Sequence, residues 1–379
     1  MTDTKSKKIA YEWVSNNNRL EALCLQWMQQ PVIALDTEFI RRRTFFPVVG
    51  LLQVADSHGV YLIDPLTASN FQPLKELFTC STVTKVLHAC SEDLEVFDRY
   101  LGLLPSPLFD TQLAAAFSGY GWSISYTNLI REIEGVDIHQ NETCSDWLQR
   151  PLSGSQLQYA AMDVYHLFQI YPKLTEQLKK LQRLEWATSD CQRLIEQYQQ
   201  ADQRQAYYLK VKSAWKLTQA QLAILKALCE WREGVVRQLD IPRNRLIKDA
   251  VLWEMAYQQP KITQQLTKIH GVPTQFVKKY GEHCLAVIED TRDNDLSLPD
   301  RLPPPLISQE ISLLKQLKSR VRAIADSLSL PTELLARKKD LEKLIRLNQT
   351  SSSVALPSSL TGWRYNVVGQ ALIKELSHE

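Results

Sequence analysis

The chain has 379 residues, of which 44% are hydrophobic and 23% are charged, with a formal net charge of +2, a balance typical of soluble globular proteins with two or three domains. Its first residues, MTDTKSKKIAYEW, lack the apolar segment of a secretory signal, and no apolar run is long enough to span a membrane, so we expect a cytoplasmic protein. The seven cysteines are scattered without a Cys-x-x-Cys pair, which predicts reduced, mostly structural thiols.

The first part of the chain predicts alternating strands and helices. The segment PVIALDTEF is suited to a strand, and VGLLQVADSHGVYLIDP predicts two strands joined by a turn at residues 57–59. Then come a helix in FQPLKELF, a short strand in TKVLHA, a helix beginning near Ser91 and a helix beginning near Thr111. Strands that alternate with helices indicate an α/β layered domain.

From about residue 151 onward the chain predicts helices and almost no strand. A glutamine-rich helical stretch over residues 174–205 is expected to connect the two halves. Farther on, DIPRNRLIKDAVLWEMA from Asp240 aligns with SLPTELLARKKDLEKLI from Ser329, at an offset of 89 residues. Each copy follows a long amphipathic helix and places a proline just before the next helix, where its missing N–H does least harm. Two similar helical domains are therefore predicted, separated by the linker DNDLSLPDRLPPPL.

Charge is divided unevenly along the chain. Residues 204–290 carry 14 Lys or Arg against 8 Asp or Glu, a net +6 that leaves −4 for the remainder. This asymmetry fits an acidic metal-binding part joined to a basic module that could hold a polyanion, although a solvated helical surface would show a similar excess. The predicted boundaries are an α/β domain at 8–175, a helical connector at 176–209, and two helical domains at 210–291 and 300–379.

Four acidic residues lie in three separated motifs: Asp36 and Glu38 in ALDTEF, Asp93 in HACSED and Asp163 in YAAMD. Asp36 and Glu38 are two apart on a predicted strand, so both carboxylates point to one face and could share a metal. Two surface acids at a strand end would be the commoner explanation for such a pair alone, but stray acids after an apolar strand would be costly. Asp93 falls in the first turn of a helix, where it could equally be an acid favoured by the helix dipole, with Ser91 as the cap.

Tyr159 and Asp163 are four residues apart on a helix whose start is marked by the capping-box pattern SGSQ. Phenol and carboxylate therefore share one face, either as an exposed Asp beside a half-buried Tyr or as part of a site in which Asp163 holds a metal. Carboxylates suit Mg²⁺ and Mn²⁺, and two such ions about 4 Å apart can clamp the attacking and leaving oxygens of a phosphodiester. A phenol with a pKa of about 10 is a poor base, so we expect Tyr159 to orient the attacking water.

The loop IRRRTFFP follows the first acidic motif and combines cations with aromatic rings. Arginines can neutralise phosphates and aromatic rings can stack on unpaired bases, a combination typical of single-strand binding surfaces. The same string would also suit a solvated hairpin edge with its phenylalanines in the core. Because the loop emerges beside the proposed metal site, we expect substrate contact from Arg41, Arg42, Arg43, Phe45 and Phe46.

Two further polar residues, His88 and Asp110, lie outside the set of four acids. His88, placed on the strand TKVLHA, could contact substrate or support the site, although a buried core histidine is the more ordinary outcome. Asp110 precedes TQLAAAF and is expected to cap that helix rather than to bind a metal.

These three ordered motifs resemble the DEDD 3′-to-5′ exonucleases, in which a DxE pair, a mid-domain Asp and a final Asp bind two metals. Tyr159 stands four residues before Asp163 and Gln158 stands five before it, which resembles the tyrosine subclass. The wider strings DTEFIRRRTFFPVVGLLQVAD and LHACSEDLEVF resemble the bacterial ribonuclease D family. Beyond them, AWKLTQAQLAILKALCEWREGVVRQLDIPRNRLIKD and HGVPTQFVKKYGE are similar to the HRDC domain, of which that family would be expected to have two copies.

The resemblance implies a ribonuclease-H-like exonuclease domain with a mixed sheet flanked by helices, followed by two small all-α HRDC-like domains. It implies hydrolytic removal of nucleotides from RNA 3′ ends, releasing nucleoside 5′-monophosphates, with tRNA precursors and other structured RNAs with unpaired 3′ tails as substrates. One of two divalent ions, Mg²⁺ or Mn²⁺, would activate water held by Tyr159, and the second would stabilise the departing 3′-oxyanion. The basic HRDC module could hold the folded RNA by its phosphates, which predicts strong salt dependence.

Two alternatives stay open at this point. A DNA-directed 3′-to-5′ exonuclease of the same superfamily would carry the same acids, although the sequence has neither a polymerase extension nor a P-loop for a fused helicase. A non-catalytic RNA-binding or assembly protein would be marked by the loss of a metal carboxylate, yet all four acids are present. A monomer is the expected oligomeric state.

Overall fold

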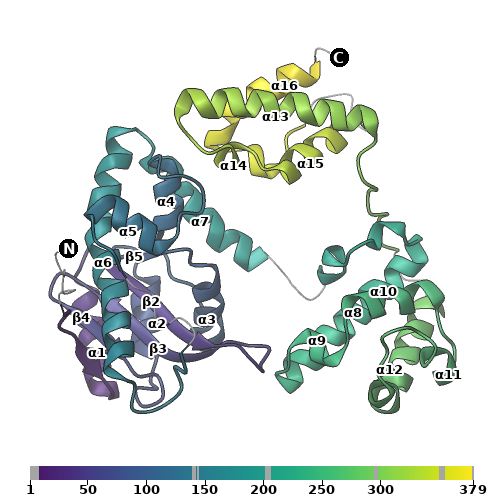
Figure 1. The fold of residues 1–379 in the computed structure, drawn as a ribbon, viewed down its shortest axis with the longest axis horizontal. Coiled ribbons are helices and arrows are strands. Elements are labelled where there is room, and N and C mark those ends of the chain that lie inside the picture. Colours follow the sequence, from purple (N-terminus) through teal and green to yellow (C-terminus); the bar gives the residue numbers. More distant parts are fainter. Residues whose placement is uncertain are drawn as a thin grey trace, which may run out of the picture. The chain divides into compact units, whose positions relative to one another are not determined.

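The computed structural model describes residues 8–138, 142, 145–200, 206–293, 298–349 and 355–377 (Figure 1). Cys144 and parts of the predicted connector and linker, residues 201–205 and 294–297, lie outside the described residues. The chain forms two compact units that do not follow its order. Unit 1 combines the α/β domain with the second helical domain, and unit 2 combines the first helical domain with the loop at Arg41–Val48.

A six-stranded mixed sheet forms the centre of unit 1, in the order β1-β4-β3-β2-β5-β6. β3 and β4 pair antiparallel, whereas β1 with β4, β2 with β5, and β5 with β6 pair parallel. The predicted α/β domain is therefore confirmed, and it gains two strands of three residues each that the sequence pattern did not predict, β1 and β6. The strands are β1 (Glu12–Val14), β2 (Val32–Ile40), β3 (Val48–Ala55), β4 (Val60–Ile63), β5 (Thr84–Leu87) and β6 (Leu108–Asp110).

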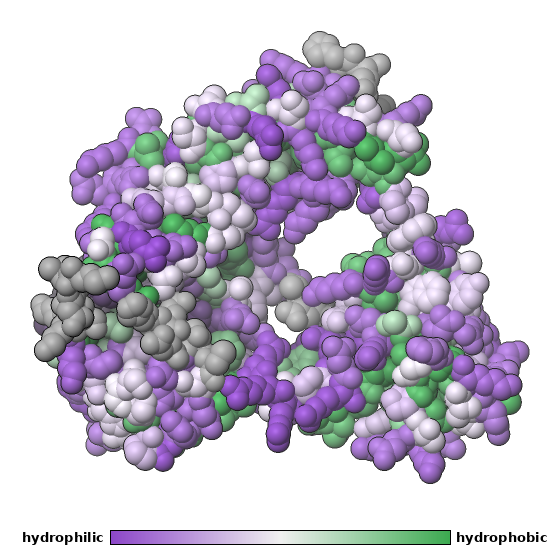
Figure 2. Space-filling view, in the orientation of Figure 1, coloured by the Kyte–Doolittle hydropathy of each residue, from purple (hydrophilic) through white to green (hydrophobic). Residues whose placement is uncertain are grey.

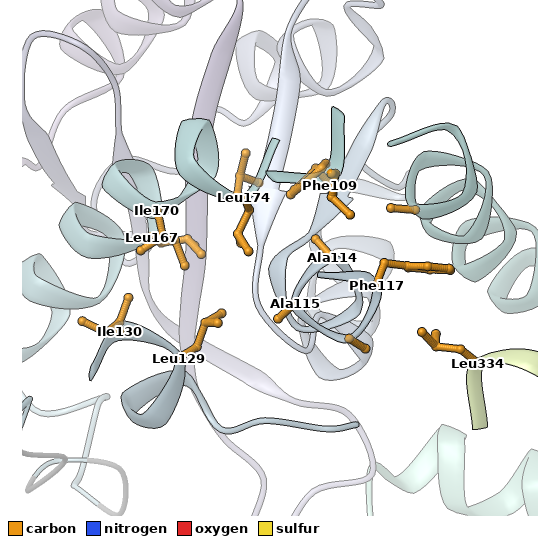
Figure 3. Close-up of a cluster of buried hydrophobic side chains, with 14 of the residues drawn as sticks. Phe109, Ala114, Ala115, Phe117, Leu129, Ile130, Leu167, Ile170, Leu174 and Leu334 are labelled. Carbon is orange, nitrogen blue, oxygen red and sulfur yellow. The ribbon is translucent and has the colours of Figure 1, made fainter. Parts of the chain in front are cut away.

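Helices cover both faces of this sheet. The helices are α1 (Asn17–Trp27), α2 (Gln72–Thr79), α3 (Ser91–Leu101), α4 (Thr111–Phe117), α5 (Tyr126–Glu134) and α6 (Gly154–Lys180). Figure 3 shows Leu167, Ile170 and Leu174 of α6 in one buried cluster with Phe109 of β6 and Phe117 of α4. On the opposite face, α2 and α3 pack over β2 and β3. α6 begins at the predicted capping box, because the side chain of Ser153 accepts from the Gln156 amide and that of Gln156 accepts from the Ser153 amide.

The connector consists of two helices rather than one stretch. α6 ends at Lys180, and α7 (Leu184–Gln200) follows it. The second helical domain packs on α4 and α7: Leu334 shares the buried cluster of Figure 3, and the ring of Trp363 stacks on Trp186 at 4.7 Å. Its elements are α13 (Ser308–Leu328), α14 (Thr332–Leu335), α15 (Lys338–Gln349), η3 (Ser358–Leu360), the π-helical η4 (Tyr365–Gly369) and α16 (Gln370–Ser377).

Unit 2 has a core of its own. Leu225 and Leu228 of α8 and Leu252 and Met255 of α10 are fully buried within it. Phe45, from the loop between β2 and β3, belongs to the same core. The elements are η1 (Tyr207–Lys210), η2 (Ala214–Lys216), α8 (Gln219–Leu239), α9 (Arg243–Leu246), α10 (Asp249–Gln258), α11 (Thr263–Leu266) and α12 (Thr274–Asp293).

The predicted repeat is confirmed element by element. α8 and α13 begin and end 89 residues apart, as do α9 and α14, and α10 begins 89 residues before α15. Both long helices end at a left-handed residue, Asp240 with φ of 49° and Ser329 with φ of 51°. Pro242 and Pro331 then stand at the N-caps of the short helices. Because even the cap conformations match, residues at this offset occupy equivalent positions in the two helical domains.

Two further observations concern the cysteines and the helices of the described residues. The six described cysteines are free thiols, and all but Cys80 are buried. In the described part of the chain, no helix has both the length and the apolar character needed to cross a membrane.

Candidate active site

The central strand β2 and the long helix α6 bring three of the four acids together. Asp36 and Glu38 lie two residues apart on β2, and Asp163 lies on α6, which packs against that strand. One carboxylate oxygen from each of the three lies within 4.8 Å of the others. The residues that the sequence analysis placed in two separate motifs therefore form one cluster of hard oxygen donors.

Asp93 stands next to this cluster rather than within the group of three. It occupies the first turn of α3 and is 8% exposed. The hydroxyl of Thr37, the residue between Asp36 and Glu38, donates a hydrogen bond to Asp93 Oδ1 at 2.5 Å. The charge of Asp93 also contributes to a raised pKa at Glu38, so the fourth acid belongs to the same electrostatic site.

Asp110 organises the start of two helices close to this site. Its carboxylate accepts from the Leu113 amide at 3.0 Å, so it caps α4 as predicted. It also accepts from the amide of Cys90 at 2.9 Å, and Cys90 is the N-cap residue of α3. The expectation that Ser91 caps α3 was wrong, because Ser91 is already the first helical residue and a carboxylate from the neighbouring strand satisfies the helix terminus instead.

The buried acids repel one another when no cation is present. Burial and the neighbouring Asp163 raise the pKa of Asp36 to about 8, and burial with the Asp36 charge raises the pKa of Glu38 to about 10. Burial raises the pKa of Asp163 to about 7, and burial with the Asp36 charge raises the pKa of Asp93 well above its ordinary value. In addition, Asp163 Oδ1 is buried without a hydrogen-bond partner. An orphaned buried oxygen among clustered carboxylates fits a divalent cation, which would satisfy both the oxygen and the charge.

Tyr159 lies one helical turn before Asp163 and is 6% exposed. Burial and the Asp163 charge raise the pKa of its hydroxyl above the ordinary value, so the phenol stays protonated at neutral pH. Hydrogen bonding from this hydroxyl acts to lower the pKa of Asp163. A permanently protonated phenol beside the acids can donate a hydrogen bond and orient a water molecule, but it cannot act as a base.

Tyr126 is a residue of this site that the sequence analysis missed. It is the first residue of α5, and its hydroxyl donates to the backbone carbonyl of Asp163, which ties α5 to the part of α6 that carries the metal ligand. Its ring also meets the ring of His88 edge-on at 5.4 Å. The only local signal was its place after the helix cap Ser125, and that signal gives no indication of a contact 37 residues away.

His88 follows β5, which ends at Leu87, and so is not part of the strand as predicted. Its Nδ1 lies 2.9 Å from the hydroxyl of Thr111, whereas its Nε2 is buried without a partner. Burial lowers the pKa of its imidazole, so the ring is neutral at physiological pH. A direct contact between His88 and substrate stays a prediction.

The loop after β2 packs into unit 2. Phe45 is 4% exposed, and the guanidinium groups of Arg237 and Arg243 lie 4.8 and 4.7 Å from its ring centroid. Phe45 is therefore a core residue, and the expectation that it stacks on bases was wrong, because cations already cover its ring. Phe46 is half-buried, with its ring centroid 4.9 Å from that of Phe45.

The three arginines of this loop, Arg41, Arg42 and Arg43, are exposed. Nε of Arg41 donates to the carbonyl of Phe45 at 2.9 Å, a contact that folds the loop back on itself. Substrate contact by the three side chains remains a prediction.

Comparison with known proteins agrees with this architecture. Residues 11–179 match the family model of a 3′-5′ exonuclease, residues 221–288 match the HRDC domain, and residues 311–372 match the C-terminal HRDC domain of ribonuclease D. Ribonuclease D of Pseudomonas paraeruginosa is 42% identical over 367 residues, which cover 96% of this chain and 97% of that protein. Ribonuclease D of Escherichia coli is 33% identical over 369 residues, which cover 96% of this chain and 97% of that protein.

The similarity extends to the three-dimensional structure. The crystal structure of Escherichia coli RNase D, described as an exoribonuclease involved in structured RNA processing, superposes with a TM-score of 0.90 at 32% identity. The superposition covers 98% of this chain and 99% of the other, so it includes the α/β domain and both helical domains. On the strength of these matches and of the acidic site on β2 and α6, the chain belongs to the ribonuclease D family of 3′-to-5′ exonucleases.

Proposed function

We propose that this protein trims RNA from its 3′ end, releasing nucleoside 5′-monophosphates by hydrolysis, with tRNA precursors and other structured RNAs with unpaired 3′ tails as its substrates. The observation that carries the proposal is the convergence of Asp36, Glu38 and Asp163 within 4.8 Å, with Tyr159 one turn away on α6. The description of the Escherichia coli relative as an exoribonuclease involved in structured RNA processing supports RNA as the substrate.

Asp36, Glu38 and Asp163 would hold divalent cations, and Asp93, oriented by Thr37, would complete the set of ligands. Two bound Mg²⁺ or Mn²⁺ ions would supply Lewis acidity that lowers the pKa of water and stabilises the leaving oxygen. Tyr159 donates a hydrogen bond to the attacking water and so fixes the direction of its lone pair toward the scissile phosphorus. Tyr126 contributes indirectly, because its hydrogen bond to the Asp163 carbonyl holds α6 in place.

Burial of the acids favours an unpaired 3′ end. Asp93 and Asp163 are 8% and 6% exposed, so a terminal phosphodiester must reach groups that lie below the protein surface. A flexible single strand can insert its last nucleotides into such a site, whereas a duplex is too wide to do so. The free cysteines support a reducing compartment such as the cytoplasm.

Digestion of a 5′-labelled RNA with a structured body and an unpaired 3′ tail tests this proposal. We expect a ladder that shortens from the 3′ end with Mg²⁺, and no cleavage with chelator or with the Asp163→Ala variant. Digestion of a DNA oligonucleotide of matched sequence establishes whether cleavage depends on the ribose 2′-hydroxyl. Intact RNA under all conditions, with the protein folded, would favour the non-catalytic RNA-binding alternative.

The role of Tyr159 is tested by replacing it with phenylalanine. The Tyr159→Phe enzyme loses one oriented donor, so we expect kcat to fall by about 100-fold. Asp36→Ala should abolish turnover altogether while the protein stays folded. A Tyr159→Phe enzyme with an unchanged rate would eliminate the water-orienting role.

A further inference from the structure

A basic hollow opens in the second helical domain, apart from the acidic site. It has a volume of about 730 Å³ and lies between α13 and the segment that contains α14 and the start of α15. Hydrophilic side chains gather over the visible face of this domain (Figure 2). Five basic side chains and one acidic side chain line the hollow: Lys315, Lys318, Arg322, Arg337, Lys338 and Glu333.

Three of these cations form a row along α13. Lys315, Lys318 and Arg322 follow one another at helical spacings of three and four, so they share one face of the helix, and all three are exposed. No acidic side chain among the described residues lies within ion-pair distance of them. Their Cα atoms span about 10 Å of helix, which is longer than a single phosphate group. The row therefore presents uncompensated charge to an extended anion.

The first helical domain has acids at two of the five positions equivalent to these basic residues. Asp249 corresponds to Lys338 and Glu233 corresponds to Arg322 at the offset of 89 residues. In the first domain Asp249 pairs with Arg232 at 2.7 Å. Thus both acidic positions of the first copy are basic in the second copy.

In the first helical domain, side chains of the domain itself fill the corresponding region. Glu233 pairs with Arg243 at 2.5 Å, and the ring of Tyr207 lies against Arg232 and Arg243 with separations of 4.8 and 4.6 Å. Val321 and Thr332 stand at the positions of Arg232 and Arg243 in the second copy. The groove that the first domain fills with ion pairs and an aromatic ring is therefore open and positively charged in the second domain.

The hollow also adjoins the catalytic domain within unit 1. The guanidinium of Arg337 lies 5.2 Å from the ring centroid of Trp122. Trp122 stands three residues before Ser125, the N-cap of α5, and α5 begins with Tyr126, whose hydroxyl holds the Asp163 carbonyl. An anion bound in the hollow would therefore rest beside the segment that supports the active site.

The second helical domain has more basic than acidic residues, whereas the part of the chain that contains the catalytic site has more acidic than basic residues. Residues 1–203 carry 17 Lys or Arg against 24 Asp or Glu, whereas residues 306–379 carry 11 against 7. The catalytic part alone would repel a polyanion, and basic surface in the same unit offsets that repulsion. We propose that the hollow between α13 and α15 binds the phosphate backbone of the RNA substrate, upstream of the 3′ end that is being cut. This inference rests on the proposed exoribonuclease function.

The test measures RNA binding without hydrolysis. Every protein carries Asp163→Ala, and a fluorescent RNA hairpin with an unpaired 3′ tail is titrated at several salt concentrations between about 50 and 200 mM. In this background Lys318→Glu/Arg322→Glu should raise Kd about 10-fold or more at the lowest salt. It should also reduce the slope of log Kd against log salt by about 1 to 2, because each phosphate contact contributes about 0.7 to 0.9.

A matched control removes the effect of total charge. Arg320→Glu/Lys374→Glu changes the net charge by the same amount, and both residues are exposed and outside the hollow. Arg320 lies two residues from both Lys318 and Arg322, so it points to nearly the opposite side of α13. The control should change Kd by less than about 3-fold and leave the salt slope near that of the Asp163→Ala parent.

Two outcomes would overturn the proposal. If both double variants weakened RNA binding equally, only the overall charge of the protein would matter. If Lys318→Glu/Arg322→Glu left RNA binding unchanged, the hollow would serve another partner, such as an acidic protein. Thermal unfolding of each variant verifies that the fold is intact. The 3′-trimming assay on the protein with its native Asp163 is independent of this experiment, so failure to cut RNA and failure to bind RNA through the hollow are separable results.

Discussion

Asp190 of α7 accepts two hydrogen bonds from the guanidinium of Arg364, which lies 174 residues later in the chain, and the Nη1 contact measures 2.6 Å. The indole of Trp363 donates to the same carboxylate at 3.1 Å, and Arg364 Nε donates to the carbonyl of Leu334. Both members of the pair are largely buried. This ion pair, with two hydrogen bonds between its members, joins the helix that follows the catalytic domain to the second helical domain.

We expect Asp190→Ala to lower the free energy of unfolding of unit 1 by about 3 to 5 kcal/mol, because it leaves the buried guanidinium of Arg364 without an anion. Chemical denaturation followed by tryptophan fluorescence measures the change, since Trp186 and Trp363 stack beside the pair. The matched control is Glu176→Ala, which removes the exposed ion pair with Lys180 and should leave the transition unchanged. An Asp190→Ala protein as stable as that control would contradict the prediction.

Gly50 of β3 offers a test of close backbone packing. A Cβ at this position would lie 2.4 Å from the carbonyl oxygen of Trp147, closer than van der Waals contact allows. The Gly50 carbonyl also accepts from Arg150 Nη2 at 2.7 Å, and Arg150 is paired with Asp64, so the strand cannot shift freely. We expect Gly50→Ala to destabilise the protein by about 1 to 3 kcal/mol in thermal unfolding.

The control for this prediction is Gly154→Ala at the first position of α6. Apart from the neighbouring residues and the backbone of its own helix, no atom lies within 4 Å of a Cβ built there, so alanine should be neutral or stabilise the helix by about 0.4 to 1 kcal/mol. Equal effects at the two glycines would show that close packing against Trp147 is not the cause.

Metal binding should be visible in the stability of the protein. Three carboxyl groups within 4.8 Å are costly to ionise in the metal-free state, as their raised pKa values show, and a bound cation stabilises their ionised forms. We expect Mg²⁺ or Mn²⁺ at about 100 times its Kd to stabilise the fold by about 2.7 kcal/mol, and chelator to reverse the effect. The measurement is a thermal shift titration.

Asp36→Asn provides the control for the metal prediction. This variant removes a carboxyl whose burial beside Asp163 raises its pKa to about 8, which is a cost to the metal-free fold, and it also removes one ligand. It should therefore melt at a higher temperature than the unmodified protein when both are metal-free at neutral pH. It should then gain little from added metal. If added metal raised the melting temperature of Asp36→Asn as much as that of the unmodified protein, the stabilising ions would bind elsewhere.

Asp240 is expected to anchor the loop that carries the three arginines. Its carboxylate accepts from the amides of Phe45 at 2.9 Å and Phe46 at 3.0 Å, and its backbone is left-handed, with φ of 49°. Asp240→Ala removes both hydrogen bonds and places a less tolerant residue in that conformation, so we expect both amides to exchange with deuterium about 10-fold faster. Asp240→Asn keeps an acceptor and tolerates the left-handed region, so its exchange should change less. Unaltered exchange in the alanine variant would show that other contacts hold the loop.

Much of the fold and of the site was predictable because its signals are local. Asp36 and Glu38 share a face because side chains alternate along a strand, and Tyr159 and Asp163 share a face because they are one helical turn apart. The cap Asp110 also follows from its neighbours in the sequence. By contrast, Tyr126 was missed because its partner lies 37 residues away, and β1 and β6 are too short to carry a periodic pattern.

The sequence by itself determined the chemistry and the architecture of each domain: four acids in three motifs, a tyrosine positioned to accompany the last acid, and two helical copies 89 residues apart. Only the tertiary structure decided which segments share a core. It buried Phe45 in unit 2, joined the second helical domain to the catalytic domain through Asp190 and Arg364, and left one of two equivalent grooves open. The physical reason is that propensity and periodicity report on neighbours within a turn or a strand. Contacts between distant segments depend instead on which apolar surfaces and charges meet after the elements have formed.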